Sequence, residues 1–105
     1  MNNEPRIPVD RDKIKSFCEK WKIIEYSFFG SVLTDNFRDD SDVNVLVEFA
    51  DDAQWGLFDM EDMESELRTL FGRSVDLLTR RSIVRSENYL MRRSVLSSAR
   101  TFYAA

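Results

Sequence analysis

Two short groups of residues, Gly30-Ser31 and Asp42-Val43-Asn44, have the types and spacing to do chemistry, and ten residues separate them. Side chains alternate between the faces of a strand, so Asp42 and Asn44 should point the same way and offer two oxygen ligands to a hard cation such as Mg²⁺. Gly30 permits a tight turn. A short helix beginning there would leave backbone N–H groups, with the Ser31 hydroxyl, available to bind phosphate. Phosphate and metal ligands side by side indicate nucleotide chemistry.

The same residues give the chain a resemblance to a known family. Gly-Ser, ten residues and then Asp-x-Asp is the signature of the minimal nucleotidyltransferases of the DNA polymerase β superfamily, and Gly30-Ser31 with Asp42 match it. The family has a third aspartate on a later strand, which Asp76 matches. The similarity continues toward the C-terminus and covers almost the whole chain. Position 44 departs from the pattern, because Asn44 stands where the family has its second aspartate.

The resemblance implies a polymerase-β-like nucleotidyltransferase fold, an α/β (α+β) single domain over residues 1–105 in which a mixed sheet packs against helices. It implies transfer of AMP from ATP to an acceptor hydroxyl, with two Mg²⁺ ions as cofactors. Asp42, Asn44 and Asp76 would be the catalytic metal ligands, and Asp76 could also take the proton of the acceptor. Gly30 and Ser31 would bind the phosphates of the nucleotide. Asn44 keeps an oxygen but lacks the negative charge, so we expect an impaired site.

The resemblance also implies a partner. Many small members of this family are encoded beside a HEPN-domain ribonuclease toxin and act as its antitoxin, some by attaching AMP to a toxin tyrosine. We therefore expect a hetero-oligomer with a HEPN-domain toxin, which is neutralised by AMP transfer and by direct binding. Two alternatives stay open. One is a binding-only antitoxin with an inactive site, which Asn44 favours; the other is a nucleotidyltransferase that acts on a small molecule or an RNA end, which normally needs additional domains.

The composition excludes several other kinds of chemistry. The chain has one cysteine, Cys18, and no histidine, which removes internal disulfides, Cys/His zinc sites and histidine-dependent catalysis. Cys18 falls on an apolar stripe at helical spacing and is expected in the core. No apolar run approaches the length of a membrane span, and the first twelve residues lack the hydrophobic stretch of a signal peptide. We therefore expect a cytoplasmic protein that contacts no membrane.

The net charge of −4 hides a strong asymmetry along the chain. Residues 67–105 carry eight arginines and two acidic residues, whereas residues 1–66 carry seven basic and seventeen acidic residues. Arginine forms forked contacts with carboxylate and phosphate, so the second part is expected to contact an acidic partner or the nucleotide, and we favour a partner. The alternative is that the two parts pair with each other or face solvent. The acidic first part argues against nucleic-acid binding.

Three strands must position the site residues. Runs rich in β-branched and aromatic residues predict strands over 23–29, 42–49 and 74–79. Gly30-Ser31 would then follow the first strand, Asp42 would begin the second and Asp76 would lie in the third.

Helices are predicted where apolar residues recur at helical spacing. These segments are 10–22, 56–71 with Gly72 as its C-cap, and 87–103, while residues 1–9 should form a loose arm. The last helix should bury six apolar residues: Leu90, Met91, Val95, Leu96, Ala99 and Phe102.

Overall fold

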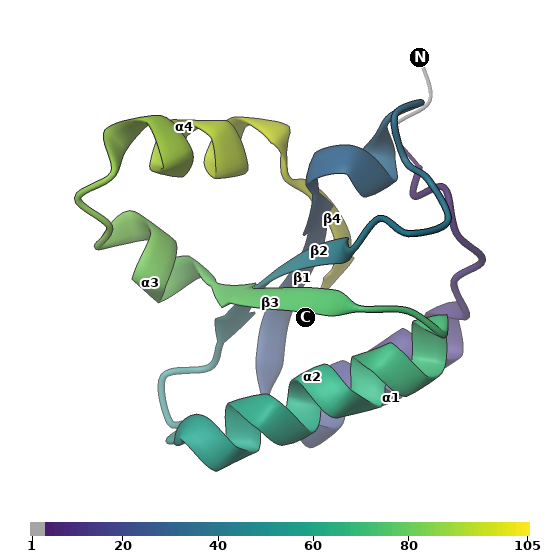
Figure 1. Ribbon diagram of the computed structural model, residues 1–105. Helices are drawn as coiled ribbons and strands as arrows, with labels where there is room; N and C mark the ends of the chain where they lie inside the picture. Colours follow the sequence, from purple (N-terminus) through teal and green to yellow (C-terminus); the bar gives the residue numbers. More distant parts are fainter. Residues whose placement is uncertain (1–3) are drawn as a thin grey trace.

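The computed structural model describes residues 4–105 and has a four-stranded sheet with helices on both faces (Figure 1). In chain order the elements are α1 (Arg11–Lys20), β1 (Ile23–Phe29), the 3₁₀ helix η1 (Gly30–Leu33), β2 (Val43–Phe49), α2 (Leu57–Phe71), β3 (Val75–Thr79), α3 (Arg80–Val84), α4 (Tyr89–Ser98) and β4 (Arg100–Ala104). None of the helices in this described part of the chain has the length and apolarity needed to cross a bilayer.

The sheet is mixed, as predicted, with strand order β3-β2-β1-β4. β1 pairs antiparallel with both β2 and β4, whereas β2 and β3 run parallel. Parallel neighbours need a crossover connection, which α2 supplies. The starts of β2 and β3 therefore lie at the same end of the sheet as the end of β1, and this shared end is where the site residues gather.

The larger core fills the space between the sheet and helices α1 and α2. Val43 and Val45 of β2 are fully buried there, in one cluster with Met63 and Leu67 of α2. Cys18 of α1 is also fully buried, which confirms that it is a core residue.

A smaller core lies on the other face of the sheet, beneath α3 and α4. Phe29 and Leu46 from the sheet pack there with Ile83 of α3 and Val95 of α4. Residues of opposite parity along β2 thus serve different cores, as the alternation of strand side chains requires.

The predicted helix over 87–103 is wrong in its second part. α4 ends at Ser98, and residues 100–104 form β4 on the free edge of β1. Thr, Phe and Tyr favour strands, and pairing satisfies the edge of β1. Phe102 contributes to the larger core through an edge-to-face contact with Phe28, with ring centroids 5.4 Å apart. Leu90 and Met91 are exposed rather than buried.

The other element boundaries differ from the predictions by two residues at most. β2 and β3 each begin one residue later than predicted, and Asp10 caps α1 through its side chain instead of joining the helix. Gly72 ends α2 in the left-handed conformation, at φ 68°, which confirms the predicted C-cap. The short helix α3 was not predicted, and the Thr79 side chain caps it by accepting from the Ser82 N–H.

The N-terminal segment is attached to the domain rather than loose. Residues 4–9 form no helix or strand, but Ile7 and Val9 pack against the larger core. The Arg6 N–H donates to the Val32 carbonyl at 2.8 Å, and its guanidinium pairs with Asp35 at 2.7 Å. The prediction of a loose arm is therefore wrong for residues 4–9, and residues 1–3 lie outside the described part.

Candidate active site

Two of the predicted site residues, Asn44 and Asp76, lie on neighbouring strands, and a third, Gly30, directly follows the strand on their other side. Phe29, the last residue of β1, pairs with Asn44 of β2, and Asn44 pairs in turn with Asp76 of β3. Gly30 follows Phe29 directly and begins η1. Adjacent strands lie about 4.8 Å apart, so Gly30, Asn44 and Asp76 cross one end of the sheet as near neighbours.

Asn44 and Asp76 belong to the sheet face that is opposite α1 and α2. Their neighbours Val43, Val45 and Val75 are buried in the larger core, and strand side chains alternate between the two faces. Asn44 is half-buried and Asp76 is exposed. A ligand would therefore reach Asn44 and Asp76 from the face of the sheet that carries the smaller core.

Asp42 lies at the same end, in the residue just before β2. Asp42 is exposed. The backbone of the next residue is fixed, because the Val43 N–H donates to the Ser74 carbonyl at 2.9 Å. The sequence prediction placed Asp42 inside the strand; the structure places it at the end of the connecting loop. All the predicted site residues thus lie at one end of the sheet or in the turn that follows β1.

Gly30 lies so close to Asn44 that a side chain at position 30 would require the Asn44 amide to move. Its φ of +78° is in the left-handed region, which disfavours side chains. A Cβ built on residue 30 would lie 2.6 Å from the amide nitrogen of Asn44. The glycine therefore supplies both the turn and the room for the side chain at position 44.

The turn after β1 is the 3₁₀ helix η1, and no side chain caps its N-terminus. Ser31 is half-buried in its first turn, and the Ser31 carbonyl accepts hydrogen bonds from the Thr34 N–H and hydroxyl, both at 2.9 Å. The prediction of a short helix after Gly30 is confirmed. Its uncapped N–H groups are oriented toward the start of the turn, which is the arrangement that accommodates an anion.

The donor set fits an oxygen-seeking cation but has one carboxylate fewer than two cations need. Asp42 and Asp76 supply carboxylates, and Asn44 supplies one neutral amide oxygen. Within residues 4–105, no three His, Cys, Asp or Glu side chains form a group that could hold a metal ion. Neither Asp42 nor Asp76 has a salt bridge to another residue in this part of the chain. Both carboxylates are therefore available to a ligand.

Arg73 fixes the loop that carries Asp42, and sequence reasoning missed it. Its guanidinium donates to the carbonyls of Arg38 and Ser41, at 3.0 and 3.3 Å, and stacks over the Phe37 ring at 4.5 Å. These contacts tie the loop to the start of β3. An arginine just before the strand of Asp76 was the available signal, but its partners are about 35 residues away in sequence and have no characteristic spacing.

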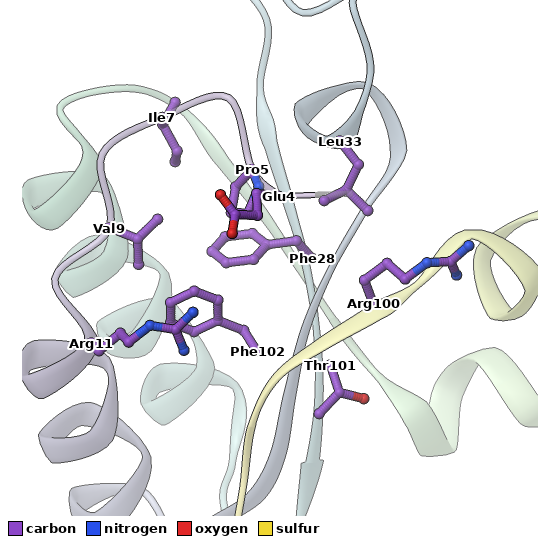
Figure 2. A pocket seen from close by; sticks show the side chains of 10 residues that line it. All are labelled: Glu4, Pro5, Ile7, Val9, Arg11, Phe28, Leu33, Arg100, Thr101 and Phe102. Atoms are coloured by element: carbon purple, nitrogen blue, oxygen red, sulfur yellow. The ribbon is translucent and has the colours of Figure 1, made fainter. Parts of the chain in front are cut away.

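A separate pocket of about 390 Å³ lies between the N-terminal segment, β1 and β4 (Figure 2). Phe28 and Phe102 line it, and the Arg11 guanidinium stacks over the Phe102 ring at 4.4 Å. Figure 2 shows Arg100 extending away from Arg11, and its guanidinium donates to the Ala99 carbonyl at 3.0 Å. None of the five predicted site residues lines this pocket, so the candidate site is the open end of the sheet and not this cavity.

The altered pKa values belong to groups elsewhere in the fold. Burial, reinforced by Glu19, raises the pKa of the Cys18 thiol to about 12. Burial, reinforced by Cys18, raises the pKa of Tyr26 well above its ordinary value. A hydrogen bond from Lys22 at 3.0 Å holds the pKa of Asp52 below its usual range. These groups bear on stability rather than on the candidate site.

Comparison with known families identifies one that spans nearly the whole chain. Residues 11–102 match the family described as nucleotidyltransferase domain. A curated protein of Methanocaldococcus jannaschii, whose assigned activity is protein adenylyltransferase, is 31% identical over 69 residues, which cover 66% of this chain and 68% of that protein.

Solved structures have the same fold. A protein assigned as a minimal nucleotidyltransferase is 29% identical with a TM-score of 0.65, and the match covers 86% of each chain. The structure of a tri-AMPylated Shewanella oneidensis HEPN toxin in complex with an MNT antitoxin contains a chain that is 18% identical. That match has a TM-score of 0.62 and covers 90% of this chain and 70% of that chain.

Proposed function

This chain belongs to the nucleotidyltransferase domain family, and from that premise we propose that it is an antitoxin of a HEPN-domain ribonuclease toxin. It binds the toxin in the cytoplasm and transfers AMP from ATP to a toxin tyrosine. The observation that carries the nucleotide part of this proposal is the closeness of Gly30, at the end of β1, to the register partners Asn44 of β2 and Asp76 of β3. The partner is suggested by the fold shared with an MNT antitoxin in complex with an AMPylated HEPN toxin.

The residues divide the work by their chemistry. The uncapped N–H groups of η1, with the Ser31 hydroxyl, bind the β- and γ-phosphates of ATP. Asp42, Asp76 and the oxygen of Asn44 would hold Mg²⁺, which would neutralise charge on the phosphates and on the departing pyrophosphate. Asp76 accepts the proton of the tyrosine hydroxyl. The tyrosine oxygen forms a bond to the α-phosphorus as the bond between that phosphorus and pyrophosphate breaks.

Asn44 limits this activity. Two Mg²⁺ ions would support the reaction, and Asn44 would offer them a neutral amide oxygen in place of a carboxylate, which weakens the hold on a second dication. The proposed antitoxin therefore transfers AMP slowly. We expect its direct binding to the toxin to be the same with asparagine or aspartate at position 44.

A binding-only antitoxin is the second candidate, and the donor set favours it. Two carboxylates and an amide do not make the three-carboxylate group that two cations require, and no such group occurs within residues 4–105. In this version the chain still binds Mg²⁺-ATP, but it neutralises the toxin by binding to the toxin surface and transfers no AMP.

One reconstitution separates these candidates. The purified chain is mixed with the HEPN-domain product of the neighbouring gene, Mg²⁺ and ATP labelled at its α-phosphate. We expect a complex stable at micromolar concentration and slow labelling of the toxin. A complex without any label would favour the binding-only antitoxin. Two proteins that migrate separately in size-exclusion chromatography would show that the chain is not an antitoxin of this toxin.

A further inference from the structure

A cleft of about 890 Å³ lies at the end of the sheet farthest from Gly30. Its floor is formed by the last residues of β2 and β3, from Val47 and Leu77 onward. The first turn of α2 forms one wall and α3 forms the other. In Figure 1 the start of α2, all of α3 and the start of α4 lie on the left of the molecule. None of the predicted site residues lines this cleft.

The walls of the cleft expose large apolar side chains. Leu57 on α2 is 87% exposed and Val84 on α3 is 53% exposed, and both line the cleft. Phe58, next to Leu57, is 84% exposed. Among residues 4–105, three of the seven exposed large hydrophobic residues lie in the start of α2 and the end of α3, and Phe58 lies beside the cleft rather than in its lining. Such a concentration on a small domain is typical of a surface that another protein covers.

The charge of the cleft indicates what that protein carries. The cleft is lined by three arginines, Arg80, Arg81 and Arg85, and by two acidic residues, Glu48 and Asp51. Arg80 faces Glu25 and Glu48, at 3.7 and 3.9 Å. In the described part of the chain, the Arg81 and Arg85 side chains have no salt bridge or hydrogen bond. Two forked cations are thus left to bind carboxylates from outside.

From these observations we infer that the cleft is the docking surface for an acidic amphipathic helix of the HEPN-domain partner. This inference rests on the proposed function and names the surface through which the partner is held. Apolar side chains spaced three and four residues apart on that helix contact Leu57, Phe58 and Val84, in the way that helices pack into hydrophobic grooves. Asp or Glu residues on its flank bind Arg81 and Arg85.

The cleft that binds the partner and the residues proposed to transfer AMP lie at opposite ends of the sheet. The cleft lies beyond the ends of β2 and β3, whereas Asn44 and Asp76 lie near their starts. A partner helix in the cleft leaves the nucleotide end of the sheet open. Loss of docking should therefore leave Mg²⁺-ATP binding unchanged, which gives the test an internal control.

The test uses two pairs of substitutions in the full chain. Leu57→Asp with Phe58→Asp removes the apolar contacts, and acidic residues in the first turn of α2 favour the helix, so folding is retained. Arg81→Glu with Arg85→Glu reverses the free charge. Lys15→Glu, at an exposed position of α1, is the control for a charge reversal elsewhere. Arg81→Lys with Arg85→Lys keeps the charge but loses the forked contacts, so it should bind more weakly than the parent and more tightly than the charge reversal.

Binding of each variant to the purified HEPN-domain partner is measured by titration calorimetry, beside Mg²⁺-ATP binding and thermal unfolding. We expect each double variant to bind the partner roughly 10–100-fold more weakly, as when central contacts of an interface are lost, and Lys15→Glu to bind like the parent. If the parent binds but both double variants bind equally well, the docking surface is wrong and the antitoxin proposal stands. If the parent itself does not bind, both proposals fail.

Discussion

Asn44 and Asp76 are register partners on the parallel strands β2 and β3. Replacing Asn44 by aspartate would therefore place a carboxylate on the strand next to the one that carries Asp76, and this added negative charge would help the site to hold two cations. We expect Asn44→Asp to raise the rate of AMP transfer to the toxin by about 10²-fold or more, comparable to restoring one well-placed electrostatic stabiliser.

The measurement is single-turnover transfer of labelled AMP by the two proteins. A second readout is thermal unfolding, because adjacent carboxylates repel one another until a cation binds. Asn44→Asp should unfold at a lower temperature than the parent without Mg²⁺ and gain more stability when Mg²⁺ is added. Equal transfer rates would mean that position 44 is not a required metal ligand.

Asp42→Ala should weaken Mg²⁺-ATP binding strongly, because it removes one of two carboxylates from a site that has no third. Titration calorimetry with Mg²⁺-ATP gives the affinity. Asp40→Ala, an exposed loop residue two positions earlier, is the matched control and should bind like the parent. If Asp42→Ala also binds like the parent, Asp42 does not belong to the nucleotide site.

Gly30→Ala should destabilise the fold more than Gly72→Ala. Both glycines have a positive φ, which costs an alanine about 1 kcal/mol. Only at Gly30 would the new Cβ also collide, at 2.6 Å from the amide nitrogen of Asn44; at Gly72 nothing lies within 4 Å.

Chemical denaturation of a double-mutant cycle isolates the collision. In an Asn44→Ala background, Gly30→Ala should cost only as much free energy of unfolding as Gly72→Ala does. An unchanged cost in that background would mean that the side chain at position 44 does not fill the space beside Gly30.

Arg73→Ala should loosen the loop that carries Asp42 without unfolding the domain. The variant loses two hydrogen bonds to loop carbonyls and the stacking on Phe37. We expect faster amide hydrogen exchange over residues 38–43 and Mg²⁺-ATP binding weaker by roughly tenfold. Arg93→Ala, at an exposed position on α4, should change neither. Normal exchange in the loop of Arg73→Ala would show that its other contacts suffice.

The stability of the domain should fall in alkaline solution because of Cys18. Its folded-state pKa is about 12, against 9.0 ordinarily, since burial favours the neutral thiol. Above pH 9 the unfolded chain releases this proton and the folded one does not. The stabilisation is therefore complete below pH 9 and declines toward pH 12, by up to about 1.4 kcal/mol per pH unit.

Urea denaturation at several pH values measures this decline. Cys18→Ala should show a shallower one, with the remainder due to Tyr26, whose pKa burial also raises. Parallel declines in both proteins would exclude a contribution from the thiol.

Local patterns in the sequence were enough to predict the parts of the fold that position the site. β1 was predicted at its observed bounds, and β2 and α2 to within one residue, because each has an apolar pattern of one clear period. The Gly-Ser turn and the spacing to Asp42 depend on residues close in sequence. These are the interactions that a linear pattern records.

The rest depends on partners distant in sequence. Residues 100–104 continue the apolar spacing of α4, and only the free edge of β1, about 75 residues earlier, makes them a strand. The contacts of Arg73 and the attachment of residues 4–9 depend in the same way on tertiary neighbours. The closeness of Gly30 and Asn44 needed the register of β1 and β2, which the sequence leaves open.

The edge position of β4 also has a consequence for biosynthesis. β1 can pair with β2 once residues 43–49 have emerged from the ribosome. Its other neighbour, β4, can pair only after residues 100–104 have emerged. During this interval the backbone of β1 presents unpaired hydrogen-bonding groups, together with the ring of Phe28 that Phe102 later contacts. A nascent strand edge of this kind can pair with another chain. Until β4 has emerged and paired, this edge of β1 therefore stays open to such an association.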